Sequence, residues 1–331
     1  MMAAPTETKM RYRPLGRSGL SVSELGFGTW GLGGNKGSVP AYGPTDDRTS
    51  RAALARALEL GINFFDTADL YGNGHSETLL GRACAGQRSH VVLATKAGLV
   101  NGGAAHNFTP LYLQRSLRAS LKRLQTDYID LFLLHNPPVS LATTAPKLWS
   151  YLNGLKERGL ARSVGVSLAG PEDGLVFACR PEIDAVQVNY NLLDQRASDC
   201  GLLDLCQSRG IGVIARTPLC FGFLSGQPAQ GSFGQDDHRR RWSASQQLRW
   251  QEGGKLFQPY HKPGETSAQF ALRFCLAASS IATTIPGMMN FAEVEENVAA
   301  CLREPLEPRT LKQIASLYAQ HSFFLGKRQG A

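Results

Sequence analysis

Short apolar runs alternate along this chain with longer segments in which apolar residues recur every three or four positions. A run of four to seven apolar residues is typical of a buried parallel strand, and the longer spacing is typical of a helix that covers it. The pattern predicts strands at residues 25–28, 63–66, 91–96, 129–135, 163–167, 185–188, 212–215 and 282–285. It predicts helices at residues 46–60, 76–84, 110–124, 146–158, 172–179, 202–209, 267–277 and 291–299.

Eight successive strand-helix units predict an α/β protein whose parallel strands close into a (β/α)8 barrel, because an open sheet rarely keeps this rhythm for so long. An N-terminal hairpin is expected at residues 11–22, a long loop at about 225–264 after the seventh strand, and an extra C-terminal helix at 310–320. The G-x-G-x-x-G match at residues 26–31 begins inside the predicted first strand instead of following it, which argues against a Rossmann domain.

The length of 331 residues suits one barrel domain over residues 1–331, with its core at about 10–320. The net charge of +8 is moderate and suits an anionic ligand such as a nucleotide. Nucleic acid is disfavoured as a partner because the one dense basic run, at residues 239–241, comes one residue after two aspartates.

Seven cysteines without a C-x-x-C pair indicate reduced thiols, with neither a disulfide framework nor a metal site. Residues 1–13 are polar, and no apolar stretch approaches the length of a membrane span. We therefore expect a cytoplasmic protein that contacts no membrane.

Three of the predicted strands end in ionisable residues. Asp66, Lys96 and His135 each terminate an apolar run, and Tyr71 follows Asp66 on the next loop. Each residue alone is more often a turn or rim residue. Because the C-terminal ends of parallel strands meet at one face, where barrel enzymes carry their active sites, we expect the four to form one site.

Such a quartet is suited to proton exchange at an oxygen atom. A phenol with a pKa of about 10 is a poor acid, but a neighbouring ammonium stabilises its phenolate. Lys96 is placed to do this for Tyr71, Asp66 to hold Lys96, and His135 to orient a carbonyl. Because no nucleophile with its own base is apparent, reduction of a carbonyl by hydride transfer fits better than hydrolysis.

The ordered motifs resemble those of the aldo-keto reductases, which are NAD(P)H-dependent oxidoreductases on an α/β barrel. The resemblance covers nearly the whole chain. It is carried by LGFGTW at 25–30, FDTADLYG at 65–72, TK at 95–96, DLFLLHNP at 130–137, GVS at 165–167, QVNYN at 187–191, TPL at 217–219, IPG at 285–287 and EN at 296–297.

The resemblance implies that Tyr71 is the general acid, that Lys96 and Asp66 tune it, and that His135 orients the carbonyl. Trp30 is expected to line the substrate pocket beside Tyr71 and His135. Arg216 stands where the family often has an aromatic beneath the nicotinamide. The implied cofactor-binding residues are Gly28, Thr29, Asp66, Ser167 and Gln187 (the last two at the carboxamide), Arg216, Thr217 and Leu219 (the pyrophosphate turn), Gly287, Glu293, and Glu296 and Asn297 near the adenine.

Two departures from the family pattern bear on the cofactor. Leu168 replaces an asparagine that shares the carboxamide, so one polar contact is expected to be missing. Gly287, Met288 and Glu293 occupy positions where many members bind a 2′-phosphate with lysine, serine and arginine or glutamine. The family favours NADP(H), which we expect to bind with weak discrimination over NAD(H), the alternative cofactor.

The residues leave other functions open. A strand-end lysine is also suited to a Schiff-base aldolase, with Lys96 as its nucleophile. A cofactor-binding regulatory subunit with slow turnover is a further alternative, because some members resemble channel β-subunits. The expected partner is a small carbonyl compound or alcohol. Its identity, the direction of the reaction and the oligomeric state are left open.

Overall fold

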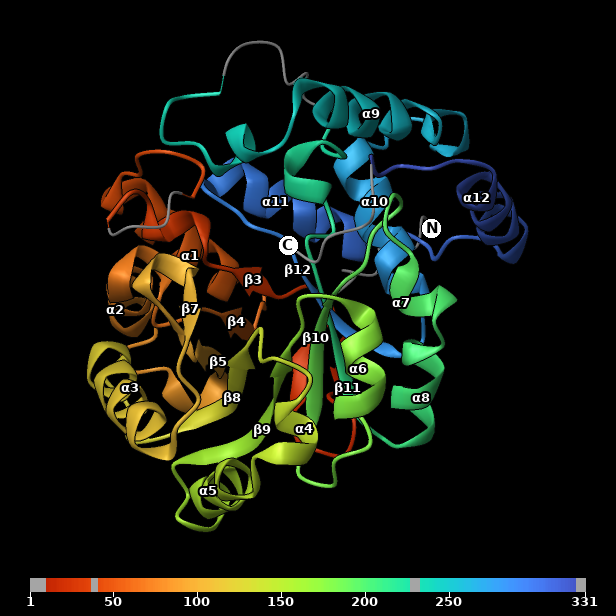
Figure 1. Cartoon of the computed structure of the whole chain (residues 1–331). Coiled ribbons are helices and arrows are strands. Elements are labelled where there is room, and N and C mark those ends of the chain that lie inside the picture. Colours follow the sequence, from red (N-terminus) through yellow and green to blue (C-terminus); the bar gives the residue numbers. More distant parts are fainter. Residues whose placement is uncertain (1–9, 37–40, 227–232, 326–331) are drawn as a thin grey trace, which may run out of the picture.

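The computed structural model describes residues 10–36, 41–226 and 233–325. Eight parallel strands form its main sheet, in the order β12-β11-β10-β9-β8-β5-β4-β3 (Figure 1). Successive strands of this sheet along the chain therefore lie side by side. The strands are β3 (Phe27–Gly28), β4 (Phe64–Asp66), β5 (Val92–Ala97), β8 (Ile129–His135), β9 (Ala161–Ser167), β10 (Ala185–Asn189), β11 (Gly212–Arg216) and β12 (Ile281–Ile285).

Backbone hydrogen bonds join the first strand region to the last and close the sheet. Gly26 N–H donates to Thr284 O at 2.8 Å, and Gly28 N–H donates to Pro286 O at 2.9 Å. Thr284 N–H in turn donates to Glu24 O at 2.9 Å. These bonds leave no open edge in the sheet, and the predicted barrel is confirmed.

A helix follows each barrel strand and packs on its outer side (Figure 1). The predicted bounds are matched to the residue at Pro110–Leu124, Ile129–His135 and Ser267–Ala277 and differ elsewhere by a few residues. The covering helices are α1 (Asp47–Glu59), α2 (His75–Ala83), α3 (Pro110–Leu124), α5 (Pro146–Glu157), α6 (Pro171–Phe177), α8 (Leu202–Ser208), α10 (Ser267–Ala277) and α11 (Phe291–Cys301). The predicted extra C-terminal helix is α12 (Pro308–Gln320), and two short helices, α4 (Leu141–Thr144) and α7 (Arg196–Asp199), lie in connections.

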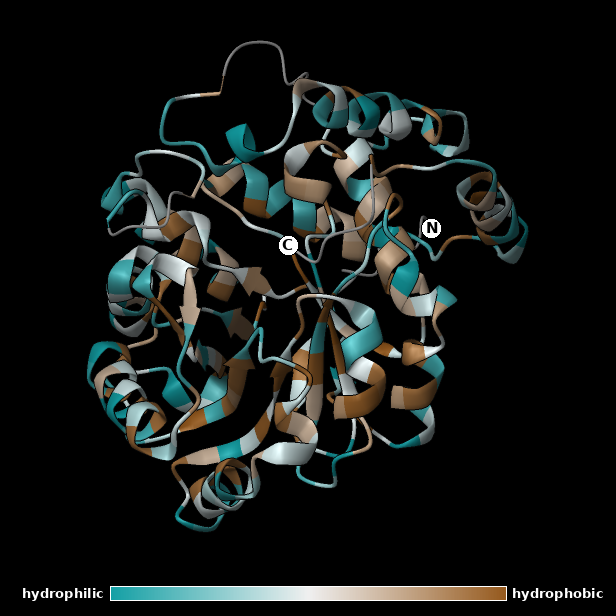
Figure 2. Ribbon diagram, viewed as in Figure 1, coloured by the Kyte–Doolittle hydropathy of each residue, from teal (hydrophilic) through white to brown (hydrophobic). Residues whose placement is uncertain are grey.

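The barrel strands consist mainly of apolar residues, which appear brown in Figure 2. One set of side chains fills the barrel interior, and the alternate set packs against the helices. Of the interior set, Phe64, Ala94, Leu133, Ala185 and Ile214 belong to one buried cluster. This alternation determines which residues at the strand ends face the mouth of the barrel.

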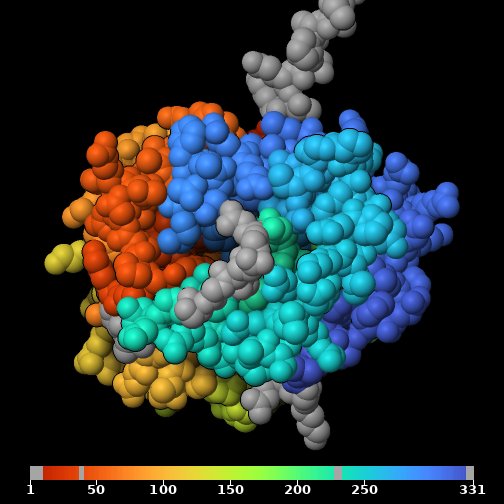
Figure 3. Space-filling model, turned by 90° about the horizontal axis from the view of Figure 1, so that it is seen from above, coloured from red at the N-terminus to blue at the C-terminus, as the bar shows by residue number. Residues whose placement is uncertain are grey.

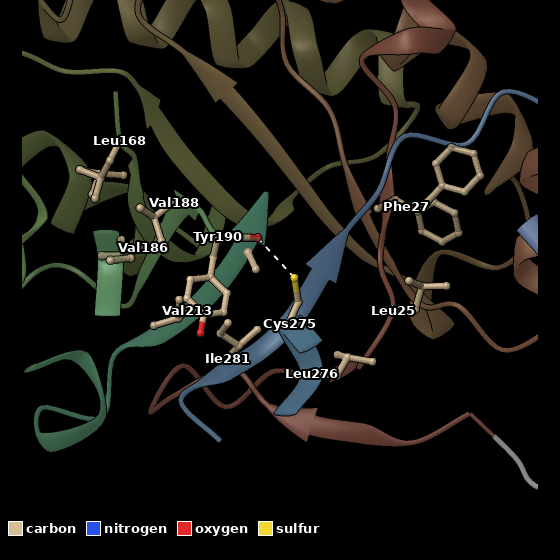
Figure 4. Packing of buried hydrophobic residues seen from close by; sticks show 14 of the residues in the cluster. Leu25, Phe27, Leu168, Val186, Val188, Tyr190, Val213, Cys275, Leu276 and Ile281 are labelled. Carbon is tan, nitrogen blue, oxygen red and sulfur yellow. Dashed lines mark hydrogen bonds between the residues drawn. The ribbon is translucent and has the colours of Figure 1, made fainter. Parts of the chain in front are cut away.

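The outer set forms the larger core between strands and helices. Figure 4 shows part of it, where Val213 and Ile281 lie close to Cys275 of α10 and Val186 lies beside Val188. The Cys275 thiol donates to Tyr190 O at 3.3 Å. The seven cysteines are all free.

The predicted N-terminal hairpin is present as β1 (Tyr12–Pro14) paired with β2 (Ser21–Ser23). It covers the end of the barrel where the strands begin, because Gly16 bridges to Ile211 just before β11. Leu15, Leu20 and Val22 of the hairpin extend the interior cluster. The opposite end, where the strands finish, is left for ligands.

Two of the connections contain structure that the pattern did not predict. The expected loop at 225–264, of which residues 227–232 lie outside the described residues, contains α9 (Ala244–Lys255). Only Gln246, Trp250 and Gly253 of this helix are buried, so its apolar periodicity is weak. A second small hairpin pairs β6 (Leu99–Val100) with β7 (Ala105–His106). No helix in the described ranges is long and apolar enough to span a membrane.

The hairpin supplies a matched test of backbone packing. Gly16 and Gly19 both have positive φ, but a Cβ at Gly16 would lie 2.3 Å from Gly212 N whereas one at Gly19 meets nothing within 4 Å. We expect Gly19→Ala to cost about 1 kcal/mol from the left-handed backbone alone. Gly16→Ala should cost at least about 2 kcal/mol more. Urea unfolding of both variants measures the difference, and equal losses would show that the hairpin is not seated on β11.

Candidate functional site

Strand alternation brings a layer of polar side chains to the mouth of the barrel. Each lies two residues beyond an interior position of its strand, as Asp66 lies beyond Phe64 and Lys96 beyond Ala94. Side chains two residues apart on a strand share a face, so these residues point inward as well. The layer consists of Asp66 of β4, Lys96 of β5, His135 of β8, Ser167 of β9, Gln187 of β10 and Arg216 of β11.

The Lys96 ammonium is the most enclosed charge of this layer. Its side chain has no exposed surface, and Nζ donates to Asp66 Oδ1 at 2.6 Å, Thr67 O at 2.9 Å and Tyr71 OH at 3.1 Å. Burial lowers the pKa of Lys96, but the Asp66 carboxylate and Tyr71 outweigh it, so the net pKa is raised. An ammonium has three protons to donate, and all three have acceptors.

A chain of hydrogen bonds continues from Asp66 across the mouth. Gln187 Nε2 donates to Asp66 Oδ2 at 2.7 Å. Ser167 Oγ donates to Gln187 Oε1 at 3.0 Å. Both carboxylate oxygens of Asp66 are therefore engaged, and the carboxylate stays oriented toward Lys96.

Tyr71 reaches the quartet from a short 3-10 helix, Tyr71–Gly74, after β4. The turn is held by close backbone contact, since a Cβ at Gly72 would lie 2.3 Å from Gly33 O. Gly72 also has a φ of 57°, which favours glycine. Burial raises the pKa of the Tyr71 phenol, and although the Lys96 ammonium lowers it, the net pKa is above its usual value. At neutral pH, Tyr71 thus holds a proton that it can donate.

His135 completes the quartet at the end of β8. Its ring lies edge-on to Tyr71, with 6.0 Å between the centroids, and its buried Nδ1 atom has no partner among the described residues. Burial lowers the pKa of His135 well below its usual 6.5, and the charges of Lys96 and Arg216 lower it further. The imidazole is neutral at physiological pH and can orient an oxygen atom without carrying charge.

Aromatic side chains line one side of the mouth. The Trp30 ring lies 6.4 Å from that of Tyr71 and 4.3 Å from that of His238. His238 and Tyr42 come from two loops that pair across the mouth, through a bridge between Tyr42 and Asp237. Trp30 was expected on this wall. Tyr42 and His238 were not, because nothing in their spacing signals that two distant loops pair.

A pocket of about 790 Å³ adjoins the mouth, between the start of α11 and the connection from β11 to α10. From above, the surface is hollowed between the blue C-terminal helices and the teal connection (Figure 3). The pocket is lined by six of the predicted cofactor residues and by Tyr42 and Arg239. Those six are Thr217, Leu219, Gly287, Glu293, Glu296 and Asn297.

The turn that enters this pocket from β11 has a strained backbone. Thr217, Cys220 and Phe221 have φ values of 53°, 45° and 57°, which side-chain-bearing residues rarely adopt. Thr217 Oγ1 donates to Asn189 Oδ1 at 2.8 Å, and Asn191 Nδ2 donates to Thr217 O at 2.9 Å. Side chains at and just after the end of β10 thus hold the turn in place, as is common where backbone strain serves ligand binding.

Glu293 lies at the first turn of α11, on the pocket wall. Its carboxylate accepts from Met289 N–H at 2.7 Å and from Asn290 Nδ2 at 2.9 Å. Asn290 in turn caps the helix by accepting from Glu293 N–H at 3.0 Å. The carboxylate therefore occupies a helix N-terminus, a position at which anions are stabilised.

Two residues expected to bind the cofactor, Thr29 and Gly28, make contacts that stabilise the backbone around the mouth. Thr29 is buried, and its hydroxyl donates to Asp66 O at 2.9 Å and accepts from Ser76 Oγ at 2.6 Å. Gly28 lies at the barrel seam, where a Cβ would come within 3.1 Å of Pro286 O. In the described ranges, no group of three histidine, cysteine, aspartate or glutamate residues is arranged to hold a metal ion.

Comparison with known proteins agrees with this geometry. The family model of the aldo/keto reductase family matches residues 24–319. The chain belongs to the aldo/keto reductase family. Its relatives include L-galactose dehydrogenase of Arabidopsis thaliana, at 33% identity over 88% of each chain. They also include a probable voltage-gated potassium channel subunit beta of rice (Oryza sativa subsp. japonica), at 30% identity over 88% of this chain and 91% of that one.

Among solved structures, the holo form of aldo-keto reductase AKR11C1 from Bacillus halodurans superposes with a TM-score of 0.78. Its sequence is 29% identical, and the alignment covers 97% of this chain and 100% of that one. The chain is thus an oxidoreductase of a family that uses NADP(H) or NAD(H).

The histidine environments predict a pH dependence. Burial lowers the pKa of His238 to about 4, and that of His135 is also depressed. We expect both rings to be neutral in the folded protein at about pH 5.5, where an unfolded imidazole is mostly protonated. Stability should thus be full above about pH 6.5 and fall below it, because unfolding then takes up protons. Ring 15N NMR, with urea unfolding at pH 7 and pH 5, measures both effects.

A matched variant isolates one of the two rings. His238 contacts Trp30 and Tyr42 through its ring, so His238→Phe keeps the aromatic packing and removes one proton-binding group. The loss of stability between pH 7 and pH 5 should become smaller in this variant. Protonated rings at pH 5.5 in the folded wild type would contradict the expectation.

Proposed function

We propose that this aldo/keto reductase reduces an aldehyde or ketone to an alcohol, reversibly, with Tyr71 as general acid. The observation that carries the proposal is the triple contact of the Lys96 ammonium with Asp66, Thr67 O and Tyr71 OH. A fixed ammonium against a buried phenol stabilises the phenolate that forms when the proton leaves.

In this reaction, a carbonyl oxygen lies between the Tyr71 hydroxyl and the neutral His135 ring. When bound, a reduced nicotinamide supplies a hydride to the carbonyl carbon. Tyr71 gives its proton to the oxygen, and the charge that develops on the phenolate is held by Lys96. Trp30 covers the side of the site and helps to exclude water.

The two alternative functions fit the geometry less well. A Schiff-base lysine must lose its proton. Burial lowers the pKa of Lys96, but Asp66 and Tyr71 raise it by more, so the net pKa is raised and the ammonium keeps its proton. A regulatory subunit with slow turnover does not require an intact proton donor, whereas here all four residues of the quartet lie together. We retain carbonyl reduction, with a small carbonyl compound or alcohol as partner and a cytoplasmic location.

The residues present suit a dinucleotide. The pocket of about 790 Å³ has room for an elongated ligand, and the strained turn at Thr217 offers backbone groups to a pyrophosphate. Ser167 and Gln187 are placed to hold a carboxamide near the quartet. Glu296 and Asn297 line the same pocket and are proposed to lie near the adenine.

We propose that NADP(H) binds with weak discrimination over NAD(H). Arg239 lines the pocket and is available to a 2′-phosphate, although it already pairs with Asp237 at 2.6 Å. Against the phosphate, the Glu293 carboxylate occupies the start of α11, where an anion would otherwise be favoured. The two effects oppose one another.

The first test of this function removes the phenolic hydroxyl. Tyr71→Phe should lower turnover with an aldehyde substrate by about a hundredfold or more, because the proton donor is lost. The dissociation constant for the reduced cofactor should stay close to that of the wild type. Near-full turnover in the variant would contradict the assignment, and borohydride trapping of substrate on Lys96 would favour the aldolase.

The second test concerns cofactor choice at Glu293. Glu293→Gln removes the charge but keeps an acceptor for Met289 N–H, and Glu293→Arg reverses the charge. We expect both to strengthen NADPH binding relative to NADH, by about threefold to tenfold, with arginine the larger effect. Titration by protein fluorescence measures this, with Glu295→Gln on the same helix as control. An unchanged preference in both variants would place the 2′-phosphate site elsewhere.

A further inference from the structure

Arg216 is a half-buried cation at the junction between the pocket and the quartet. It ends β11 in the inward-facing layer, and the next residue, Thr217, lines the pocket. Burial has the largest effect on the pKa values of Tyr71 and His135, raising the first and lowering the second, and the Arg216 charge lowers both. The guanidinium therefore acts electrostatically on the atoms that would contact a carbonyl oxygen.

No carboxylate in the described part of the chain forms a salt bridge with Arg216. Its Nη2 donates to the backbone oxygen of Leu168 at 2.7 Å, and its buried Nε has no partner there. The buried cations Lys96 and Arg196 differ, since Lys96 pairs with Asp66 and Arg196 with Asp194. Removing an unpaired charge from water costs free energy. The affinity of a ligand bound beside Arg216 is therefore expected to depend on the charge of that ligand.

The bond to Leu168 fixes where the guanidinium lies. Leu168 follows β9 and Arg216 ends β11, so the side chain crosses the end of β10, the strand between them. Gln187 of β10 and Ser167 of β9 therefore lie next to it. These are the residues proposed to hold a carboxamide.

We propose that Arg216 gives the site a preference for the reduced over the oxidised form of the nicotinamide cofactor. The inference rests on the proposed function. A hydride donor must lie about 3–3.5 Å from a carbonyl carbon whose oxygen contacts Tyr71 and His135. The rest of the dinucleotide lies in the pocket beyond Thr217, so the ring lies against Arg216.

The preference follows from charge. The reduced ring is neutral, and loss of a hydride, which carries two electrons and one proton, leaves a ring with a charge of +1. A fixed cation a few ångströms away destabilises the positive ring and leaves the neutral ring largely unaffected. In the reduction, the carbonyl carbon takes the hydride and its oxygen takes the Tyr71 proton. The charge of Arg216 weakens binding of the positive, oxidised ring, so it disfavours the binding step of alcohol oxidation and aids release of the oxidised cofactor after reduction.

The test compares dissociation constants for NADH, NAD⁺, NADPH and NADP⁺ by protein fluorescence. Arg216→Met removes the charge and retains the length of the side chain, and Arg216→Lys retains the charge. Arg209→Met, an exposed arginine after α8, controls for net charge. In Arg216→Met, the ratio of the oxidised to the reduced dissociation constant should fall about tenfold. Arg216→Lys should keep most of the wild-type ratio, and Arg209→Met all of it.

Other outcomes overturn the proposal. If Arg216→Met weakened binding of the reduced and the oxidised cofactor equally, Arg216 would contact the cofactor without discriminating between its redox forms. Unchanged dissociation constants, with a raised KM only for carboxylate-bearing carbonyl substrates, would make it a site for an anionic substrate group. If Arg216→Met does not fold by circular dichroism, Arg216→Gln is compared with Arg216→Lys in the same way. Failure of the wild type to bind any of the four nucleotides would instead contradict the proposed function.

Discussion

The buried ammonium of Lys96 is the interaction on which the mouth of the barrel depends. An ammonium without exposed surface is tolerated only if its protons have acceptors, and here they come from Asp66, Thr67 O and Tyr71 OH. All three belong to β4 or the loop after it. The need to satisfy one charge therefore holds the β4 loop against β5. The same contacts put the phenol where a proton can be delivered, so stability and chemistry depend on one set of bonds.

Much of the fold follows from local pattern, because period-two alternation and helical spacing are properties of short segments. The strand Ile129–His135 and the helix Pro110–Leu124 agree with their predicted bounds to the residue. The first barrel strand is shorter than expected, at Phe27–Gly28, because its other backbone bonds cross the seam to Thr284 instead of forming a regular ladder. Helix α9 escaped prediction because its buried stripe is narrow and contains a glutamine and a glycine.

The candidate site was predictable to the same extent. Asp66, Lys96 and His135 could be assigned because each ends an apolar run, and parallel strands end at one face. Contacts between distant loops could not be assigned, since no periodicity relates Tyr42 to Asp237 or Trp30 to His238. Glu293 was expected to meet a ribose or phosphate from its position alone. That its carboxylate accepts from Met289 N–H depends on how α11 begins, which the order of residues does not reveal.

Two departures from the family pattern, Leu168 and Arg216, are parts of one arrangement. The Leu168 side chain packs outward, because it is buried among the outer core residues and a Cβ at Gly174 would lie 2.7 Å from it. It therefore offers no polar group to the mouth, but its backbone oxygen accepts from Arg216. A guanidinium has five N–H donors and a carbonyl oxygen uses one of them, which leaves donors facing the place where a polar contact is missing. The lost side-chain contact and the gained cation thus occur at one place. Replacing Arg216 would remove the donor to Leu168 O, whereas a replacement at Leu168 would keep that backbone oxygen.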